Sequence, residues 1–271
     1  MRRTKVIGWG LALACACGLM TAASASAEEL PELGRCVKVA GTGAYTRASC
    51  VPFSKTHTGE YEWLPGPGAN PAFKARLSNT KLETVGGQKI VCTFTFIEGE
   101  FTGTKTLKTS NLTIQSCNLV GPNLPCFSSF TEQGTIESKE PLIGDLGPIP
   151  GAINPANPHL GWDLKPESGS KIVEFNCGEG KLGVPVYKVA LEGSVIGRVV
   201  KTNKMAELFS LNYKQEKGIQ IPEAFIGGAK DTLTQVLTPT SNPTEPKIEQ
   251  VGLAGGGELE TKEALEFKAK A

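Results

Sequence analysis

Residues 81–97, KLETVGGQKIVCTFTFI, contain the strongest indication of the fold. Lys81–Val85 runs into Gly86-Gly87, which is a two-residue hairpin signal, and the chain returns through Lys89–Ile97. Successive side chains of a strand point to opposite faces. Here this gives one face of Ile90, Cys92, Phe94 and Phe96 and a second of Val91, Thr93, Thr95 and Ile97. Both faces are apolar or β-branched, so we expect a central strand.

The next segments extend this hairpin. Glu98-Gly99 turns the chain into Glu100–Leu107, and Lys108–Asn111 turns it again into Leu112–Cys117. Three strands joined by short turns predict an antiparallel meander.

The rest of the chain is divided into short pieces by 32 glycines and 18 prolines, a composition that favours strands and turns. Further strands are expected within Thr131–Ile143, Lys171–Cys177, Val184–Val200, Phe209–Tyr213, Leu233–Leu237 and, after Gly255-Gly256-Gly257, Glu258–Ala269. Gly144–Pro166 holds five prolines and four glycines and predicts a surface loop. Thr202–Phe209 is the single helix candidate and is also compatible with a strand. The prediction is an all-β fold, an antiparallel sandwich or barrel with at most one short helix.

Met1–Ala27 has the pattern of a secretory signal peptide. A cationic start is followed by the uncharged Val6–Met20 and by Ala25-Ser26-Ala27 before Glu28. We expect cleavage after Ala27 and secretion of residues 28–271 as one β-rich extracellular domain. No later run in the chain reaches the ~20 apolar residues that a membrane helix needs.

Lipid anchoring is disfavoured, because Ala12 and Ala14 occupy the positions three residues before Cys15 and Cys17, where lipoproteins carry an aliphatic residue. Without the leader, 25 basic side chains face 27 acidic ones. This nearly neutral balance argues against a nucleic-acid partner and against docking on anionic lipid. The composition remains compatible with contact to cell-wall or extracellular polysaccharide.

Six cysteines follow the leader, and an even number in an exported chain predicts a disulfide framework. They are Cys36, Cys50, Cys92, Cys117, Cys126 and Cys177. The chain has no C-x-x-C spacing and two histidines, so no metal or cofactor is expected. Short loops close more easily, which predicts the pairs Cys36–Cys50 and Cys117–Cys126 and leaves Cys92–Cys177. The first pair would close a small N-terminal subregion.

No catalytic residue is assigned, because titratable side chains are few. Asp145, Asp163 and Asp231 are the only aspartates, and His159 lies four residues before Asp163 in the expected loop. This spacing predicts a solvated pair rather than part of a hydrolytic triad.

Two pairs of glutamates support an enzymatic alternative, a secreted polysaccharide hydrolase. Glu98 and Glu100 lie at a turn, and Glu60 and Glu62 flank Tyr61. Residues i and i+2 of a strand lie ~6.5–7 Å apart, which is near the separation of carboxylates in inverting glycosidases. However, the acid and the base of such enzymes come from opposite walls of a groove. We therefore expect both glutamate pairs to be solvated side chains at the ends of hairpins.

Tyr61, Trp63 and Trp162 are the candidate ligand-stacking residues. An exposed Trp–Tyr pair can stack on sugar rings, which would make the chain a carbohydrate-binding module. The alternative is that Trp63 anchors the core beside Cys36–Cys50. Our main expectation is a secreted, non-catalytic binding or structural protein of the cell exterior.

The layout resembles a group of secreted, β-rich proteins of Gram-positive soil bacteria. The resemblance covers most of the exported chain and rests on Glu32–Cys36, Gly59–Trp63, Leu82-Glu83-Thr84 with Gly86-Gly87, Gly99-Glu100 with Gly103 and Lys105-Thr106, and Asn203-Lys204-Met205. It implies secretion and a β-rich fold, and it implies no activity or site residues.

Overall fold

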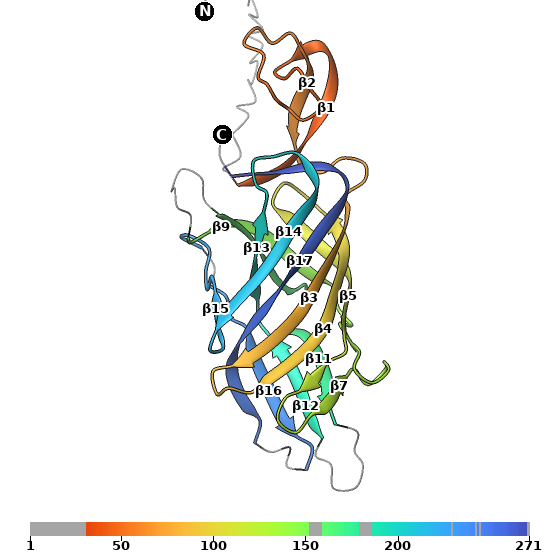
Figure 1. Ribbon diagram of the computed structural model, residues 1–271, viewed down its shortest axis with the longest axis vertical. Helices are drawn as coiled ribbons and strands as arrows, with labels where there is room; N and C mark the ends of the chain where they lie inside the picture. Colours follow the sequence, from red (N-terminus) through yellow and green to blue (C-terminus); the bar gives the residue numbers. More distant parts are fainter. Residues whose placement is uncertain are drawn as a thin grey trace, which may run out of the picture.

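The computed structural model describes residues 31–151, 159–178, 186–228, 230–241, 243 and 245–269. The leader Met1–Ala27 and its cleavage site lie outside these residues. The described chain is all-β and contains no helix (Figure 1). Its strands are β1 (Glu32–Gly43), β2 (Gly59–Pro65), β3 (Ala72–Thr84), β4 (Lys89–Phe101), β5 (Thr106–Gln115), β6 (Asn118–Leu119), β7 (Leu124–Phe127), β8 (Ile136–Glu137), β9 (Leu142–Ile149), β10 (His159–Pro166), β11 (Lys171–Cys177), β12 (Tyr187–Glu192), β13 (Val195–Val200), β14 (Ala206–Glu216), β15 (Ile219–Ile221), β16 (Thr234–Pro239) and β17 (Lys247–Lys268).

Eight strands close into a ring in which every neighbour is antiparallel. The order around the ring is β3, β4, β5, β9, β10, β13, β14 and β17, and β17 returns to β3. Neighbours in the ring follow the order of the chain, with only the last ladder joining its two ends. The sheet therefore closes as a barrel does and leaves no long unpaired edge in this ring.

A second ring uses the other end of the longest strands. In it β4 pairs with β6, and the ladder continues through β7, β11, β12 and β16 back to β17 and β3. Figure 1 shows β3, β4 and β17 running along the molecule between the two ends. The two rings thus share three strands and lie one above the other.

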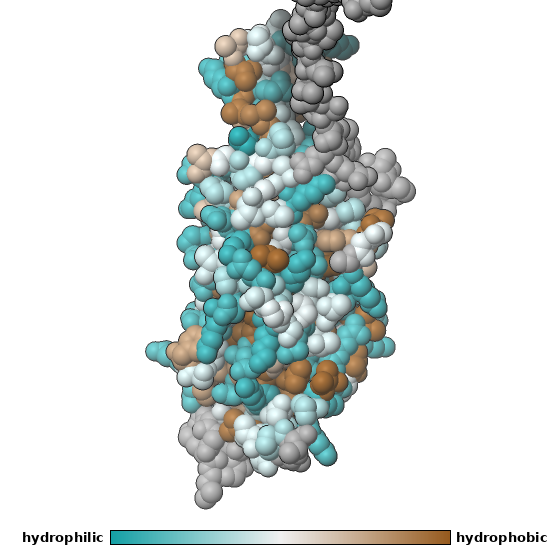
Figure 2. Space-filling model, turned by 180° about the vertical axis from the view of Figure 1, so that it is seen from behind, coloured by the Kyte–Doolittle hydropathy of each residue, from teal (hydrophilic) through white to brown (hydrophobic). Residues whose placement is uncertain are grey.

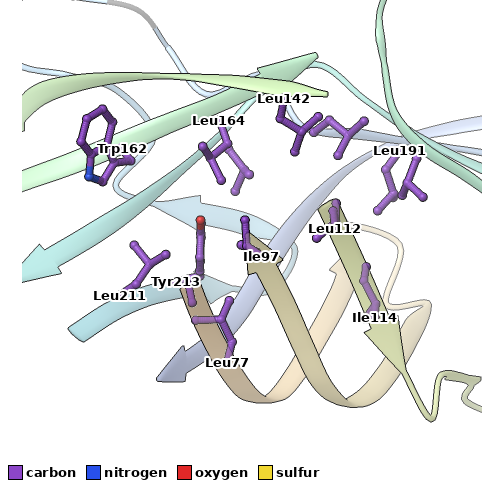
Figure 3. Packing of buried hydrophobic residues seen from close by; sticks show 14 of the residues in the cluster. Leu77, Ile97, Leu112, Ile114, Leu142, Trp162, Leu164, Leu191, Leu211 and Tyr213 are labelled. Carbon is purple, nitrogen blue, oxygen red and sulfur yellow. The ribbon is translucent and has the colours of Figure 1, made fainter. Parts of the chain in front are cut away.

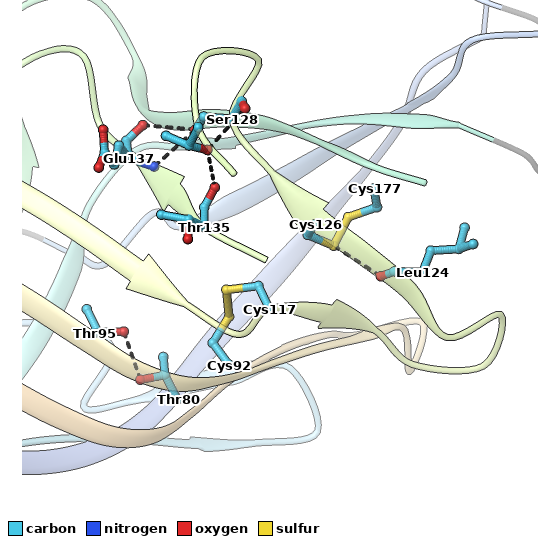
Figure 4. The surroundings of a disulfide bond; sticks show 11 residues. Thr80, Cys92, Thr95, Cys117, Leu124, Cys126, Ser128, Thr135, Glu137 and Cys177 are labelled. Atoms are coloured by element: carbon cyan, nitrogen blue, oxygen red, sulfur yellow. Dashed lines mark hydrogen bonds between the residues drawn. A yellow bond between two sulfur atoms is a disulfide. The ribbon is translucent and has the colours of Figure 1, made fainter. Parts of the chain in front are cut away.

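The shared strands change their inward face where the rings meet. In β4 Cys92 is buried, Thr93 is exposed, and the next fully buried side chain is Thr95. In β3 Asn79 has a left-handed backbone, with φ of 51°, and interrupts the alternation in the same way. The β3–β4 register is the same on both sides of this point, with Ser78 opposite Phe94 and Thr80 opposite Cys92, so the two strands change phase together. The register shift lies on the other side of β3, where β17 passes from Ala254 to Gly256. The buried hydroxyls of Thr80 and Thr95, 2.9 Å apart, join the strands there (Figure 4).

This change of phase corrects the predicted faces of β4. Phe94 and Phe96 do not share the inward face of Ile90 and Cys92 but lie half-buried on the outside. The Arg76 guanidinium covers them, 4.4 Å from the centre of the Phe94 ring. Sequence alternation alone gives no sign of the phase shift.

The strand β17 is longer than predicted and contains the glycine triplet instead of following it. At Gly257 a β-carbon would overlap the carbonyl oxygen of Arg76 on β3, so only glycine fits this close approach. At Gly255 the register shifts and φ is 158°. The triplet lets β17 pair with β3 on one side and β14 on the other at the same point.

The expected loop Gly144–Pro166 is also wrong, because β9 and β10 come from it and complete the first ring. Pro148 fits into β9 because its carbonyl points away from β10 and accepts a hydrogen bond from the Ile226 N–H at 2.8 Å. The missing N–H of Pro148 would lie on that same side, so the β9–β10 ladder loses no bond. The helix candidate Thr202–Phe209 is a turn leading into β14, where Phe209 and Leu211 alternate inward.

Apolar side chains from the strands of both rings fill the interior and form the core. Figure 3 shows Leu77, Ile97, Leu112, Leu164 and Leu211 pointing toward one another from five strands. At one end of the first ring an aromatic cluster is formed by Phe73, Phe101, Trp162, Phe209 and Phe267, whose neighbouring ring centres lie 4.7–6.1 Å apart.

A hairpin of β1 and β2 extends beyond the rings at the top of Figure 1. Its base joins the barrel because Glu32–Gly34 pairs with the end of β17. The Cys36–Cys50 disulfide closes it, as predicted. Val51 and Phe53 are more than half exposed on this hairpin, and the space-filling view shows brown side chains gathered there, whereas lower down they are scattered among teal ones (Figure 2).

The two remaining disulfides differ from the prediction. Cys92 bonds to Cys117 and Cys126 bonds to Cys177, which replaces the expected Cys117–Cys126 and Cys92–Cys177 pairs (Figure 4). The reason is the ladder: Cys126 lies directly opposite Cys177 in the β7–β11 register. Loop length, the criterion used on the sequence, does not report which strands become neighbours.

We predict that replacing both Cys126 and Cys177 by alanine lowers the free energy of unfolding by about 4 kcal/mol, the loop-entropy value for a closed loop of roughly 50 residues. The sequence separation of this pair is 51 residues. Urea unfolding of the oxidised protein measures the loss. Replacing Cys36 and Cys50 is the matched control, with a smaller expected loss because its loop spans 14 residues. A peptide map joining Cys92 to Cys177 would contradict the assignment.

Candidate functional site: a groove lined by hydrogen-bond donors

A groove of about 410 Å³ lies on the outer face of the first ring, where β10, β13 and β14 meet β15. We call it the donor groove. Figure 1 shows β15 beside β14 on one flank of the molecule. The donor groove is lined by Ile149, Pro150, Gly151, His159, Arg198, Asn212, Lys214, Gln220, Ile221, Pro222 and Glu223.

Arg198 lies at its centre because β13 alternates. Val195 and Val199 belong to the core, so Arg198 between them in the alternation projects outward. It lies opposite Asn212 in the β13–β14 register. The Nε of Arg198 is buried and has no hydrogen-bond partner in the described part of the chain.

Gln220 contributes a second buried donor from β15. Its side chain is 1% exposed, and its Oε1 accepts a hydrogen bond from the backbone N–H of Leu253 at 2.7 Å. Leu253 needs this acceptor because the β14–β17 ladder begins only at Gly255. The backbone donor fixes the orientation of the amide, since only the oxygen can accept. The Nε2 of Gln220 is left buried, again with no partner among the described residues.

The other polar side chains make the donor groove positive. Arg198 and Lys214 each lack an ion pair with any described carboxylate, and Glu223 is 3.7 Å from the Lys230 ammonium. Burial, together with the nearby charge of Arg198, lowers the pKa of His159 below its ordinary value. His159 is therefore neutral at neutral pH and offers one N–H donor.

The three aspartates gather beside the donor groove, on the same outer face. Asp145 and Asp163 are opposite each other in the β9–β10 register. Asp231 is 5% exposed, and its carboxylate accepts hydrogen bonds from the backbone N–H groups of Ile196 and Leu233 at 3.2 and 3.0 Å. The segment between β15 and β16 covers this face, with the Phe225 ring against Gly147. We call Asp145, Asp163 and Asp231 the aspartate cluster.

Burial controls the ionisation of this cluster. It raises the pKa of Asp231 to about 6, against the lowering effect of its two backbone hydrogen bonds. Burial also raises the pKa of Asp163, which is 3% exposed. Asp145 is half exposed and forms an ion pair with Lys165 at 2.5 Å. Backbone contacts of this kind indicate that Asp231 holds the covering segment in place.

The stacking prediction is wrong for Trp162, which is 1% exposed and packs between Phe101 and Phe267. Trp63 is half-buried against Gly34, with the Lys268 ammonium 4.3 Å from its ring centre. Tyr61 is half-buried on the same hairpin strand, β2. A stacking role of Tyr61 and Trp63 stays a prediction, and neither residue lines the donor groove.

The glutamate pairs are engaged in local contacts. Glu98 forms an ion pair with Lys74 on the neighbouring β3, at 2.6 Å. Glu62 accepts a hydrogen bond from the Ala44 N–H at 2.8 Å, and Glu60 lies 3.9 Å from Lys38. These contacts hold strands together and lend no support to a groove with two facing carboxylates.

His159 and Asp163 share the outer face of β10 rather than a solvated loop, because four residues separate them on a strand. Only His159 lines the donor groove, while Asp163 lines a separate hollow together with Ser194, Lys230 and Thr232. The structure therefore does not bring them together as a catalytic pair.

Sequence reasoning did not single out Arg198, Lys214 or Gln220. The one available signal was Arg198, which is the single charged residue in the apolar run Val195–Val200. Gln220 gave none, because its role depends on a backbone N–H more than thirty residues later in the chain.

Comparisons with protein-family models, with curated proteins and with solved structures find no match for this chain. Over the described residues, no helix has the length and apolar character required to cross a bilayer. The same residues contain no group of three or more histidine, cysteine, aspartate or glutamate side chains placed to hold a metal ion.

We predict that the Asp231→Asn variant gains stability relative to the wild type as the pH rises. The folded pKa of about 6 lies above the ordinary 3.8, so the folded state holds the proton more tightly than the unfolded state. The stability that Asp231 contributes is complete below about pH 4 and is lost as the pH rises through 6.

From pH 4.5 to pH 7 the free energy of unfolding of the variant, minus that of the wild type, should increase by about 2 kcal/mol. Urea unfolding at both pH values measures this difference. Asp145→Asn is the control and should show a much smaller change, because that side chain is half exposed. A difference for Asp231→Asn that does not vary with pH would contradict the prediction.

Proposed function

We propose that this chain acts outside the cell as a non-catalytic binding protein and that the donor groove is its ligand site. Three disulfides fit an extracellular protein. The leader pattern of Met1–Ala27 and the resemblance to secreted, β-rich proteins of Gram-positive soil bacteria support export.

The observation that carries the proposal is the pair of unsatisfied buried donors, Arg198 Nε and Gln220 Nε2, in one concave site. A buried donor without a partner costs about 1–3 kcal/mol. Such groups are rare and call for an explanation. A ligand that supplies acceptor oxygens would remove the penalty from both donors at once.

The make-up of the donor groove favours binding over catalysis. It offers donors from Arg198, Lys214, Gln220 and His159, but the described residues of its lining include no serine, cysteine or carboxylate pair to act as a nucleophile or as an acid and base. Ladders on both sides fix β10, β13 and β14, and β15 is held by its ladder with β14 and by the Gln220–Leu253 hydrogen bond. A preformed site of this kind lowers the entropic cost of binding.

The test is a thermal-unfolding screen of residues 28–271 against a panel of amino acids, neutral oligosaccharides, organic acids and sugar phosphates. We expect at least one compound, at about 100 times its Kd, to raise the Tm by roughly 5 °C or more. Mass spectrometry should recover that compound unchanged.

Asn212→Trp, which fills the donor groove, should abolish the shift. Asn111→Trp, at an exposed position on the outside of β5, should preserve it. A panel without any stabilising compound, or a compound that is chemically converted, would contradict the proposal.

A further inference from the structure

We infer that the ligand of the donor groove is a small organic anion held by its oxyanion, either a carboxylate or a phosphate group. This inference rests on the proposed function and deepens it. It follows from the balance of donors and acceptors, the position of the Arg198 Nε, and the apolar part of the lining.

The donor groove has more donors than acceptors. Arg198 and Lys214 are cations without ion pairs among the described carboxylates, and Gln220 presents an amide N–H because its oxygen is used by Leu253. Glu223 is the single carboxylate among the described lining residues, and it lies 3.7 Å from Lys230. A ligand matching this site must bring acceptors and negative charge.

Arg198 offers the edge that oxyanions prefer. Its Nε and the adjacent guanidinium nitrogen can donate two parallel hydrogen bonds to the two oxygens of a carboxylate or a phosphate. The buried Nε has no protein partner within the described chain to compete for this edge. The neighbouring Gln220 amide is fixed by the backbone and cannot turn its oxygen toward the ligand.

The remaining lining excludes two other ligand classes. A metal ion or an organic cation would meet the unpaired charges of Arg198 and Lys214. Neutral sugars are held largely by stacking on aromatic rings, and no Phe, Tyr or Trp is found among the lining residues that the structure describes.

The size of the donor groove and its apolar wall indicate an organic molecule rather than a bare ion. A volume of about 410 Å³ falls within the range of small-molecule sites. Ile149, Pro150, Ile221 and Pro222 supply carbon surface next to the donors. The oxyanion therefore belongs to a metabolite-sized body.

The experiment compares two matched pairs of probes by isothermal titration calorimetry: D-galacturonate with D-galactose, and glucose 6-phosphate with glucose. Each pair differs in the presence of the anionic group. We expect at least one anion to bind at least tenfold more tightly than its neutral counterpart, with an affinity that falls as salt is added. The pair that responds identifies the group as a carboxylate or a phosphate.

Gln220→Glu is the sharpest variant, because its carboxylate still accepts from the Leu253 N–H while the donor is lost and a negative charge is added. It should weaken anion binding at least tenfold. Burial of the new carboxylate also costs stability, so binding is measured below the Tm of the variant. Arg198→Gln should weaken binding by a similar factor. Arg76→Gln makes the same change of charge on the outside of β3, beside Phe94, and should leave binding unchanged.

Each outcome decides between the two proposals. If a neutral sugar binds as well as its anionic partner, or if neither anion binds below 10 mM, the inference is wrong. In either case the proposed function stands as long as the ligand panel contains a stabilising compound that Asn212→Trp no longer binds. If the panel contains none, the proposed function fails as well.

Discussion

The ladder between β17 and β3 is the interaction on which the rest of this structure depends. It pairs Val251–Thr261 with residues 73–84 and joins the two ends of the strand order, so that both rings are closed by the same contact. The ladder is possible only because Gly257 admits the backbone of Arg76. Without it, β3 and β17 would be open edges, and the core between them would face water.

The donor groove is a by-product of how these strands are arranged. Where β17 leaves the β14 ladder, the Leu253 N–H needs an acceptor, and Gln220 supplies it from β15. This contact uses the amide oxygen and leaves the amide N–H of Gln220 without a partner among the described residues, on a residue that lines the same groove as Arg198 and Lys214. The aspartate cluster fixes the neighbouring covering segment in the same manner, through backbone N–H groups. Side chains that complete the backbone hydrogen bonding thus also shape the concave surface.

The sequence was sufficient to predict the fold class but insufficient to predict which strands lie next to one another. The hairpin at Gly86-Gly87 and the Cys36–Cys50 pair follow from local patterns and are present. The turns predicted at Glu98-Gly99 and Lys108–Asn111 are wrong, because these residues lie inside β4 and β5, and the chain turns between Phe101 and Thr106 instead. The partners of Cys92 and Cys177 depend on which strands lie side by side, and the outward position of Phe94 depends on the change of inward face where the two rings meet. The prolines of Gly144–Pro166 led to the prediction of a loop instead of β9 and β10. Pro148 is compatible with a strand because its position costs the β9–β10 ladder no hydrogen bond. At the site, His159 was predicted to lie in a solvated loop but lies on β10. Arg198 and Gln220 could not be predicted, because their places in the groove depend on strand register.

The order of the strands also bears on how the barrel assembles. Each strand of the first ring pairs with its predecessor, so most ladders can form while the chain emerges from its N-terminal end. The exception is β3, whose second partner is the last strand of all. Its free backbone groups must wait for some 170 further residues before they are covered. Such a delay makes closure a slow, long-range event and leaves the nascent protein most exposed to self-association immediately before completion.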